Sequence, residues 1–200
     1  MKTRMQLSKK YIILGLLPAI AIGGLFYSNF QTTENNFTEV PRDSPEAKFI
    51  LLSNAKTNLC SSPNFLDSQD DGNMLQGSCC TKMDFDRYME QTEGLKEYSS
   101  INVIPSDPYN IPVSLAKKLI DYRKTITLNP QQQMVYNDAM NMSYEGGPCC
   151  CKCWRWYAFD GQAKYLITEY NFDAKQIAHV WDIEDGCGGK GHEGHFQPQS

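Results

Sequence analysis

The hydrophobic pattern divides the chain into one long apolar run near its beginning and a longer body of mixed composition. The run covers residues 11–30, contains no charged residue and follows the basic pair Lys9 and Lys10. About 20 apolar residues suffice to cross a membrane as a helix, and basic residues before such a helix favour the cytoplasmic side. We therefore expect a basic cytoplasmic segment over 1–10 and a transmembrane anchor over 11–30. This predicts a single-pass protein of the cell membrane whose C-terminal domain faces outside the cytoplasm; a cleaved signal peptide is the alternative interpretation.

The segment that follows the run has the composition of a tether. Residues 31–46 are polar and include Pro41 and Pro45, as in linkers that hold a domain away from a membrane. The remaining sequence predicts a cysteine-rich extracytoplasmic domain over 47–188. A flexible tail rich in glycine and histidine is expected over 189–200.

Within this domain, apolar residues recur three or four positions apart, which indicates amphipathic helices. The expected helices cover about 83–98, 114–126, 130–142, 160–170 and 173–183. Asn129-Pro130 combines a capping residue with proline at the first helical position, and Ser114 and Asp160 are expected to cap two of the other helices. The apolar run 48–52 fits a strand or a buried helical turn, whereas 53–78 and 99–112 have the composition of loops.

These patterns favour a mainly α fold: a small irregular helical domain with a cysteine-rich cluster, behind one N-terminal membrane helix. An α+β fold is the alternative, with a small hairpin over 154–169 that turns at Asp160-Gly161. The alternative rests on the tryptophan, tyrosine and phenylalanine residues of this segment, which favour strands.

The distribution of charged residues narrows the classes of partner that this protein is expected to bind. Four of the 19 basic residues lie in residues 1–30 with no acidic residue, which leaves 15 basic and 23 acidic residues, a net charge of −8, in residues 31–200. An acidic body argues against a nucleic-acid-binding surface and is compatible with the attraction of cations.

Eight cysteines carry the strongest chemical signal, and four of them lie within five residues. Their positions are Cys60, Cys79, Cys80, Cys149, Cys150, Cys151, Cys153 and Cys187. An exported domain with an even number of cysteines is ordinarily disulfide-bonded, and four bridges between the clustered and the outer cysteines are one interpretation.

A thiolate metal site is the other interpretation. In an extended backbone Cys149, Cys151 and Cys153 point the same way, whereas in a helix Cys149, Cys150 and Cys153 share a face. Either arrangement presents three soft ligands together, which suits monovalent copper or zinc. The candidate metal ligands are Cys79, Cys80, Cys149, Cys150, Cys151, Cys153, Cys187, His192 and His195.

The clustered cysteines also carry a family resemblance. The segment Pro148-Cys149-Cys150-Cys151-Lys152-Cys153 resembles the P-C-Y-C-G-C signature of a group of exported, mostly bacterial lipoproteins of unassigned function. Cys150 and Lys152 replace the tyrosine and glycine of the signature, and a membrane anchor replaces the lipid-bearing cysteine. The resemblance implies an exported, cysteine-rich, metal-associated protein and implies no reaction.

Motifs for most other chemistries are missing from the sequence. Trp154 follows the C-x-x-C of Cys150 and Cys153, so haem attachment is excluded there, and no P-loop indicates a nucleotide cofactor. We therefore expect a membrane-anchored, outward-facing copper-binding protein that is not a catalyst and exchanges ions with a donor or acceptor protein. An exported thiol–disulfide oxidoreductase and a disulfide-stabilised structural or interaction domain are the alternatives.

Overall fold

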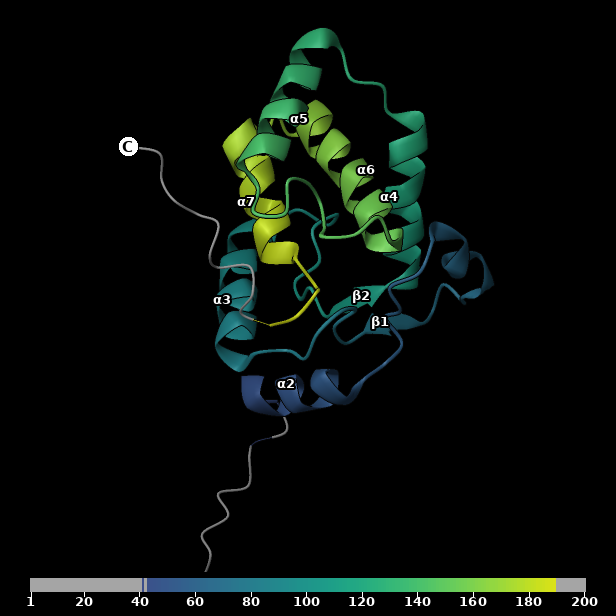
Figure 1. The fold of residues 1–200 in the computed structure, drawn as a ribbon, viewed down its shortest axis with the longest axis vertical. Helices are drawn as coiled ribbons and strands as arrows, with labels where there is room; N and C mark the ends of the chain where they lie inside the picture. Colours follow the sequence, from purple (N-terminus) through teal and green to yellow (C-terminus); the bar gives the residue numbers. More distant parts are fainter. Residues whose placement is uncertain (1–40, 42, 190–200) are drawn as a thin grey trace, which may run out of the picture. The chain divides into compact units, whose positions relative to one another are not determined.

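The computed structural model describes residues 41 and 43–189 (Figure 1). The expected cytoplasmic segment and membrane anchor, most of the linker, and His192 and His195 lie outside these residues. Among the described residues, no helix has both the length and the apolar character needed to cross a membrane.

The described residues form a mainly helical fold, as predicted. The helices are α2 (Pro45–Asn54), α3 (Phe85–Leu95), α4 (Val113–Thr125), α5 (Pro130–Met142), α6 (Trp154–Glu169) and α7 (Ala174–Glu184). Two short 3₁₀ helices, η1 (Pro63–Ser68) and η2 (Lys96–Tyr98), lie in the connections.

Local capping explains why several helices begin where the sequence predicts. Asn129 caps α5 in a capping box with Gln132, and Asp173 caps α7 in the same way with Gln176. The helix predicted over 83–98 is α3 followed by η2, and Asp84 caps its start.

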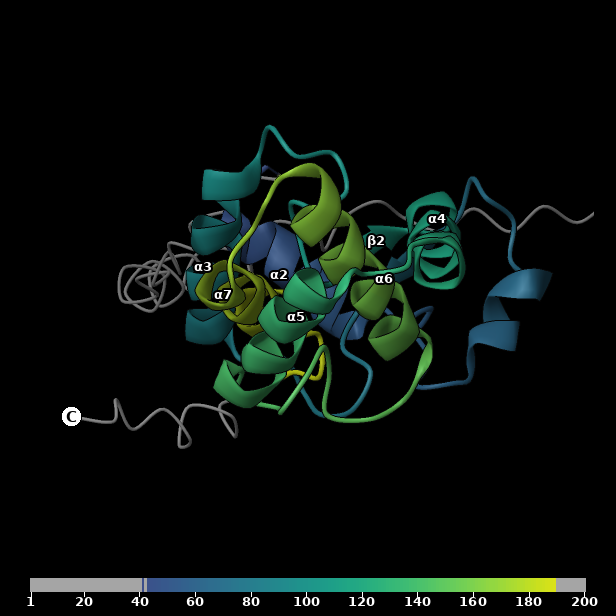
Figure 2. The ribbon, with the colours of Figure 1, turned by 90° about the horizontal axis from the view of Figure 1, so that it is seen from above.

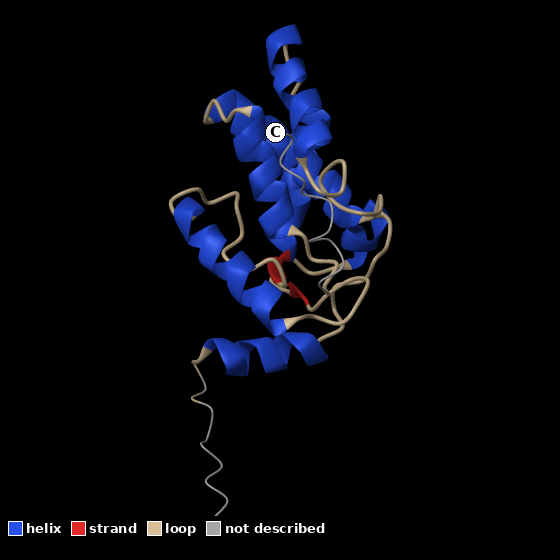
Figure 3. Cartoon of the chain, turned by 60° about the vertical axis from the view of Figure 1, so that its left-hand side comes forward, coloured by secondary structure: helices blue, strands red, loops and turns tan. Residues whose placement is uncertain are grey.

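The run 48–52 belongs to helix α2, which Ser44 caps two residues inside the predicted linker. The loop predicted over 53–78 contains η1 and strand β1 (Met74–Gln76), and strand β2 (Asn110–Pro112) ends the second loop. The two strands pair antiparallel with Leu75 opposite Ile111, and Figure 3 shows this small sheet among the helices. Three-residue strands leave too little alternation for a sequence pattern to reveal.

Residues 154–169 form one continuous helix, so the hairpin alternative is wrong, and Asp160 lies inside the helix rather than at its start. Gly161 explains the position of this helix. A methyl group at Gly161 would lie 1.9 Å from the carbonyl oxygen of Leu119, so the absence of a side chain lets α6 pack closely against α4. Asp160 points to the same helix and pairs with Arg123 at 2.6 Å.

The core lies where α6 meets α4 and α5, and where α7 packs between α3 and α5 (Figure 2). Trp154, Phe159, Leu166 and Trp181 are almost fully buried there. Packing of these large side chains fixes the ends of α6 and α7, and both ends lead directly to cysteine-bearing segments.

Candidate metal centre

All eight cysteines of the chain converge on one region, although they come from four separate segments. Cys60 precedes η1, Cys79 and Cys80 follow β1, Cys149 to Cys153 connect α5 to α6, and Cys187 follows α7. Every one of these segments lies outside the helices and strands, so the helices form the frame and the irregular segments carry the sulfurs.

Backbone hydrogen bonds join the four segments in pairs. The amide of Cys79 donates to the carbonyl oxygen of Gly186 at 3.0 Å. The amide of Thr81 donates to the carbonyl oxygen of Cys187 at 2.8 Å. On the other side, Trp154 donates its amide to Ser61 at 2.7 Å and its indole N–H to Leu59 at 3.1 Å. These bonds hold the backbone around the cysteines independently of any bond between sulfurs.

The sulfur atoms lie at contact distances rather than bonding distances. The Sγ–Sγ distance is 2.8 Å between Cys150 and Cys187, 3.1 Å between Cys60 and Cys151, and 3.6 Å between Cys149 and Cys187. A disulfide would bring two sulfurs to about 2.05 Å. All eight cysteines are therefore free thiols in this structure.

Among the residues that the structure describes, five overlapping groups each contain three ligand atoms within 4.8 Å of one another, close enough for one metal ion to bind all three. Four groups consist of cysteines alone, and the fifth combines Cys149 and Cys187 with Asp185. Because the groups share members, they connect all eight thiols into one cluster, which we call the thiol cluster.

One side of the thiol cluster is open to solvent and the other side is buried. Cys149 and Cys153 are each 4% exposed and Cys187 is 1% exposed, whereas Cys60, Cys80 and Cys150 are exposed. An ion therefore has a path to the sulfurs without any movement of the helices.

A buried cation lies behind the thiol cluster. Arg155, the second residue of α6, is completely buried and donates to the carbonyl oxygens of Glu184, at 3.0 Å, and Pro108. Gly186 makes room for it, because a methyl group there would lie 2.2 Å from the guanidinium carbon. This charge favours the ionised form of neighbouring thiols.

The thiols differ in their tendency to ionise. Hydrogen bonding with Cys149 is the main cause that lowers the pKa of Cys79, and the charge of Arg155 adds a smaller effect in the same direction. Contacts with Cys153 and Cys187 lower the pKa of Cys149. Burial raises the pKa of Cys80 to about 11, and contacts with Cys149 and Cys79 raise the pKa of Cys187.

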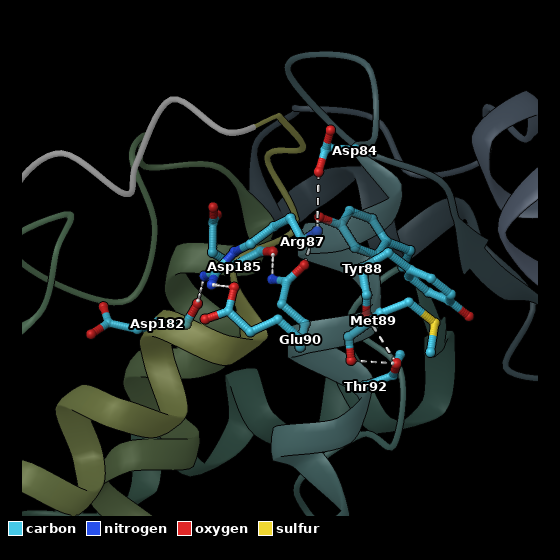
Figure 4. A network of polar contacts seen from close by, with 10 residues as sticks. Asp84, Arg87, Tyr88, Met89, Glu90, Thr92, Asp182 and Asp185 are labelled. Carbon is cyan, nitrogen blue, oxygen red and sulfur yellow. Dashed lines mark hydrogen bonds and ion pairs between the residues drawn. The ribbon is translucent and has the colours of Figure 1, made fainter.

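Contacts between α3 and α7 position the segment that carries Cys187. Arg87 donates to the carbonyl of Asp182 at 2.6 Å, and Figure 4 shows its side chain directed to the end of α7. One turn farther along α3, Gln91 donates to the carbonyl of Asp185 at 2.6 Å. The carboxylate of Asp185 in turn accepts from the amide of Cys187 at 3.1 Å, which fixes the turn after the helix.

The structure brings together all seven cysteines that the sequence predicts as ligands. The segment from Cys149 to Cys153 is neither the strand nor the helix considered above but a loop of bends. Trp154 lies in the main core, and Trp156 packs against the thiol cluster.

Three residues of the site were not expected from the sequence. Cys60 is missing from the predicted metal ligands and was considered only as an outer cysteine for a disulfide, yet its sulfur lies 3.1 Å from that of Cys151. Asp185 and Arg155 have no motif of their own, and only their positions beside Gly186 and Cys187 reveal them. Comparison with protein-family models, curated proteins and solved structures finds no match to this chain.

Proposed function

We propose that this protein binds a soft metal, with monovalent copper as the preferred ion, through the thiol cluster. The convergence of eight free thiols from four segments is the observation that supports the proposal most strongly. Thiolates are the ligands that monovalent copper and zinc favour, and three-sulfur groups suit the low coordination number of copper in this state.

The surroundings support ion exchange rather than catalysis. The cluster has an exposed side formed by Cys60, Cys80 and Cys150, through which an ion passes to or from a donor or acceptor protein. We propose that a membrane anchor over 11–30 holds this domain outside the cytoplasm, in keeping with the exported proteins whose cysteine motif it resembles.

Anaerobic titration tests the proposal. The full-length protein is reduced and titrated with monovalent copper against a chromophoric chelator, and with zinc in parallel. We expect wild type to take copper from the chelator. The variant with Cys149, Cys151 and Cys153 changed to serine should bind at least ten-fold more weakly, a loss of about 1.4 kcal/mol or more.

Lys152→Ser is the matched control, because it places the same new residue in the same loop. The ammonium of Lys152 lies over the ring of Trp156 at 5.3 Å, and the residue is exposed, so this variant should keep the affinity of wild type. Equal affinity of wild type and the triple variant would contradict the proposal. Eight paired cysteines in freshly isolated protein would favour a structural role, and rapid turnover of a disulfide substrate would favour an oxidoreductase.

A further inference from the structure

The thiol cluster contains more sulfurs than one ion can use. A thiolate-bound ion takes three or four sulfurs, whereas all eight thiols lie in one connected set. A single ion would leave at least four closely spaced thiols without a ligand role. The number of sulfurs therefore bears on how many ions the site holds, a question that rests on the proposed function.

The all-cysteine groups have a simple connectivity. The four groups are Cys60–Cys79–Cys80, Cys60–Cys151–Cys153, Cys149–Cys150–Cys151 and Cys80–Cys150–Cys187. Each group shares one sulfur with the group before it and one with the group after it, and the fourth group returns to the first. The four groups thus close into a ring.

Four cysteines are shared between two groups of this ring, and four belong to one group only. The shared cysteines are Cys60, Cys80, Cys150 and Cys151, and the others are Cys79, Cys149, Cys153 and Cys187. If each shared sulfur binds two ions and each of the others binds one, the eight sulfurs make twelve bonds. Twelve bonds give three sulfurs to each of four ions, and no sulfur is left over. We propose that the thiol cluster binds four monovalent copper ions as a ring of three-coordinate sites joined by these shared thiolates.

The spacing of the sulfurs fits this arrangement with small adjustments. Metal–sulfur bonds of about 2.3 Å place the three sulfurs of a flat site about 4 Å apart. The Sγ–Sγ distance is 3.6 Å between Cys79 and Cys80 and 3.9 Å between Cys80 and Cys150. Two pairs are closer, Cys150 and Cys187 at 2.8 Å and Cys60 and Cys151 at 3.1 Å. Each pair must separate by about 1 Å, and all four residues lie outside the helices and strands.

Charge favours monovalent over divalent ions. Eight thiolates around four monovalent ions leave the ring anionic, whereas four divalent ions would make it neutral. Arg155 is a completely buried cation on the inner side, and its Nε has no hydrogen-bond partner among the described residues. An anionic ring adds to the stabilisation that Asp185 already gives this buried cation, whereas a neutral ring would add nothing.

Exposure gives most of the shared cysteines a second property in common. Three of the four shared cysteines, Cys60, Cys80 and Cys150, are exposed, and three of the four others, Cys149, Cys153 and Cys187, are buried. Cys151 and Cys79 are both half-buried. The shared sulfurs therefore lie toward the open side of the cluster. Ions that enter there meet first the sulfurs that serve two sites, which favours filling of neighbouring sites together.

Native mass spectrometry under anaerobic conditions tests the ring. The reduced full-length protein is titrated with monovalent copper in the presence of a competing chelator. We expect saturation at four ions per chain, with the metal-free and four-ion forms dominating at intermediate copper. Saturation at one ion would overturn the ring but leave the proposed function intact, and no bound copper would overturn both. Any other saturating number also overturns the ring.

Cys80→Ser and Cys79→Ser form the matched pair of variants. The two residues are adjacent, but Cys80 belongs to two groups of the ring and Cys79 to one. Loss of Cys80 leaves two groups with two sulfurs, so this variant should lose two ions. Loss of Cys79 affects one group and should lose one ion. Cys60→Ser also removes a shared sulfur, at an exposed residue, and should likewise lose two ions. Circular dichroism of the metal-free variants confirms that each is folded. Equal losses from Cys79→Ser and Cys80→Ser would contradict the shared arrangement.

Discussion

Arg155 interacts with two parts of the structure. Its guanidinium donates hydrogen bonds to two backbone carbonyls and also lies near the thiols. The carbonyls belong to Glu184, at the end of α7, and to Pro108, two residues before β2. The sequence shows this arginine only as a basic residue between Trp154 and Trp156. Its partners lie 29 and 47 residues away, so no local pattern could reveal them.

Arg155→Met and Arg155→Lys separate these interactions. The methionine variant leaves both carbonyls without a donor and removes the charge, so we expect it to lower the free energy of unfolding by about 3 kcal/mol. The lysine variant keeps the charge and one donor, and should lose about 1 kcal/mol. Urea unfolding of the reduced protein measures both.

Copper affinity provides the second readout for these two variants. If the buried charge favours the thiolates, the methionine variant binds monovalent copper more weakly than the lysine variant. Equal copper affinity of the two variants would show that the charge of Arg155 has no role at the cluster.

Cys60 shows most plainly what a sequence pattern misses at a single residue. It has no nearby cysteine, and it stands 91 residues before Cys151, its contact in the structure. By contrast, the segment from Cys149 to Cys153 could be predicted as a site from the sequence. Four cysteines within five residues lie close together in any backbone conformation.

At the scale of helices, the contact of α6 with α4 depends on one glycine. A methyl group at Gly161 would also lie 2.6 Å from the amide nitrogen of Arg123, and both contacts are with backbone that has no room to shift. Gly94 in α3 is a matched control, because a methyl group there would lie 3.5 Å from Ile183, an ordinary contact distance.

Gly161→Ala should lower the free energy of unfolding by about 3 kcal/mol, because it forces α6 away from α4. Gly94→Ala should be neutral or should stabilise the protein by up to about 1 kcal/mol, since alanine is the better helix former. Denaturant unfolding followed by circular dichroism compares the two. A similar effect of both substitutions would show that the close approach of the two helices is not needed.

These helices also show how far local sequence determines the elements. The starts of α5 and α7 could be predicted because their capping residues act within three positions. The start of α6 could not, because Asp160 and Gly161 carry the signals of a cap or turn while their partners Arg123 and Leu119 lie in another helix. Packing of α6 against α4 overrides those local preferences.

The last turn of α7 contains a carboxyl group that resists ionisation. Burial is the main cause that raises the pKa of Asp182 to about 7, against the lowering effects of the Tyr144 amide and of Arg87, while Asp185 and Glu145 raise it further. Because the folded state binds this proton more tightly than the unfolded state, the contribution of Asp182 to stability falls as pH rises from about 4 to 7.

Asp182→Asn mimics the protonated form and keeps an oxygen to accept from the Tyr144 amide, which lies 2.9 Å away. The variant should equal wild type in stability below about pH 3, where the carboxyl group is mostly protonated in both states, and should exceed it near pH 8. Urea unfolding of the reduced protein across this range measures the difference. A difference that does not change with pH would contradict the assignment.

At the scale of the whole molecule, the thiol cluster joins segments that are far apart along the chain. Contacting cysteines are separated by 38, 70, 91 and 108 residues. Ions bound to these sulfurs would cross-link the folded state only, because the unfolded chain does not hold the ligands together.

Copper should therefore raise the melting temperature of the reduced protein. At a free copper concentration of 100 times the dissociation constant, one bound ion by itself stabilises the folded state by about 2.7 kcal/mol. For a domain of this size that corresponds to a shift of roughly 5–10 °C. Anaerobic calorimetry measures the shift. The variant with Cys149, Cys151 and Cys153 changed to serine keeps only two of the four cysteine groups and should show a clearly smaller shift. A full shift in that variant would place the bound copper elsewhere.

Cys187 is the last of the eight cysteines to be synthesised. A growing polypeptide exposes Cys60 long before Cys187 has been added, and the Cys80–Cys150–Cys187 group is complete only when α7 has been synthesised and folded. The proposed ring therefore closes only after α7 has been added to the chain. Its last site can be filled only in the finished fold, through the exposed side formed by Cys60, Cys80 and Cys150.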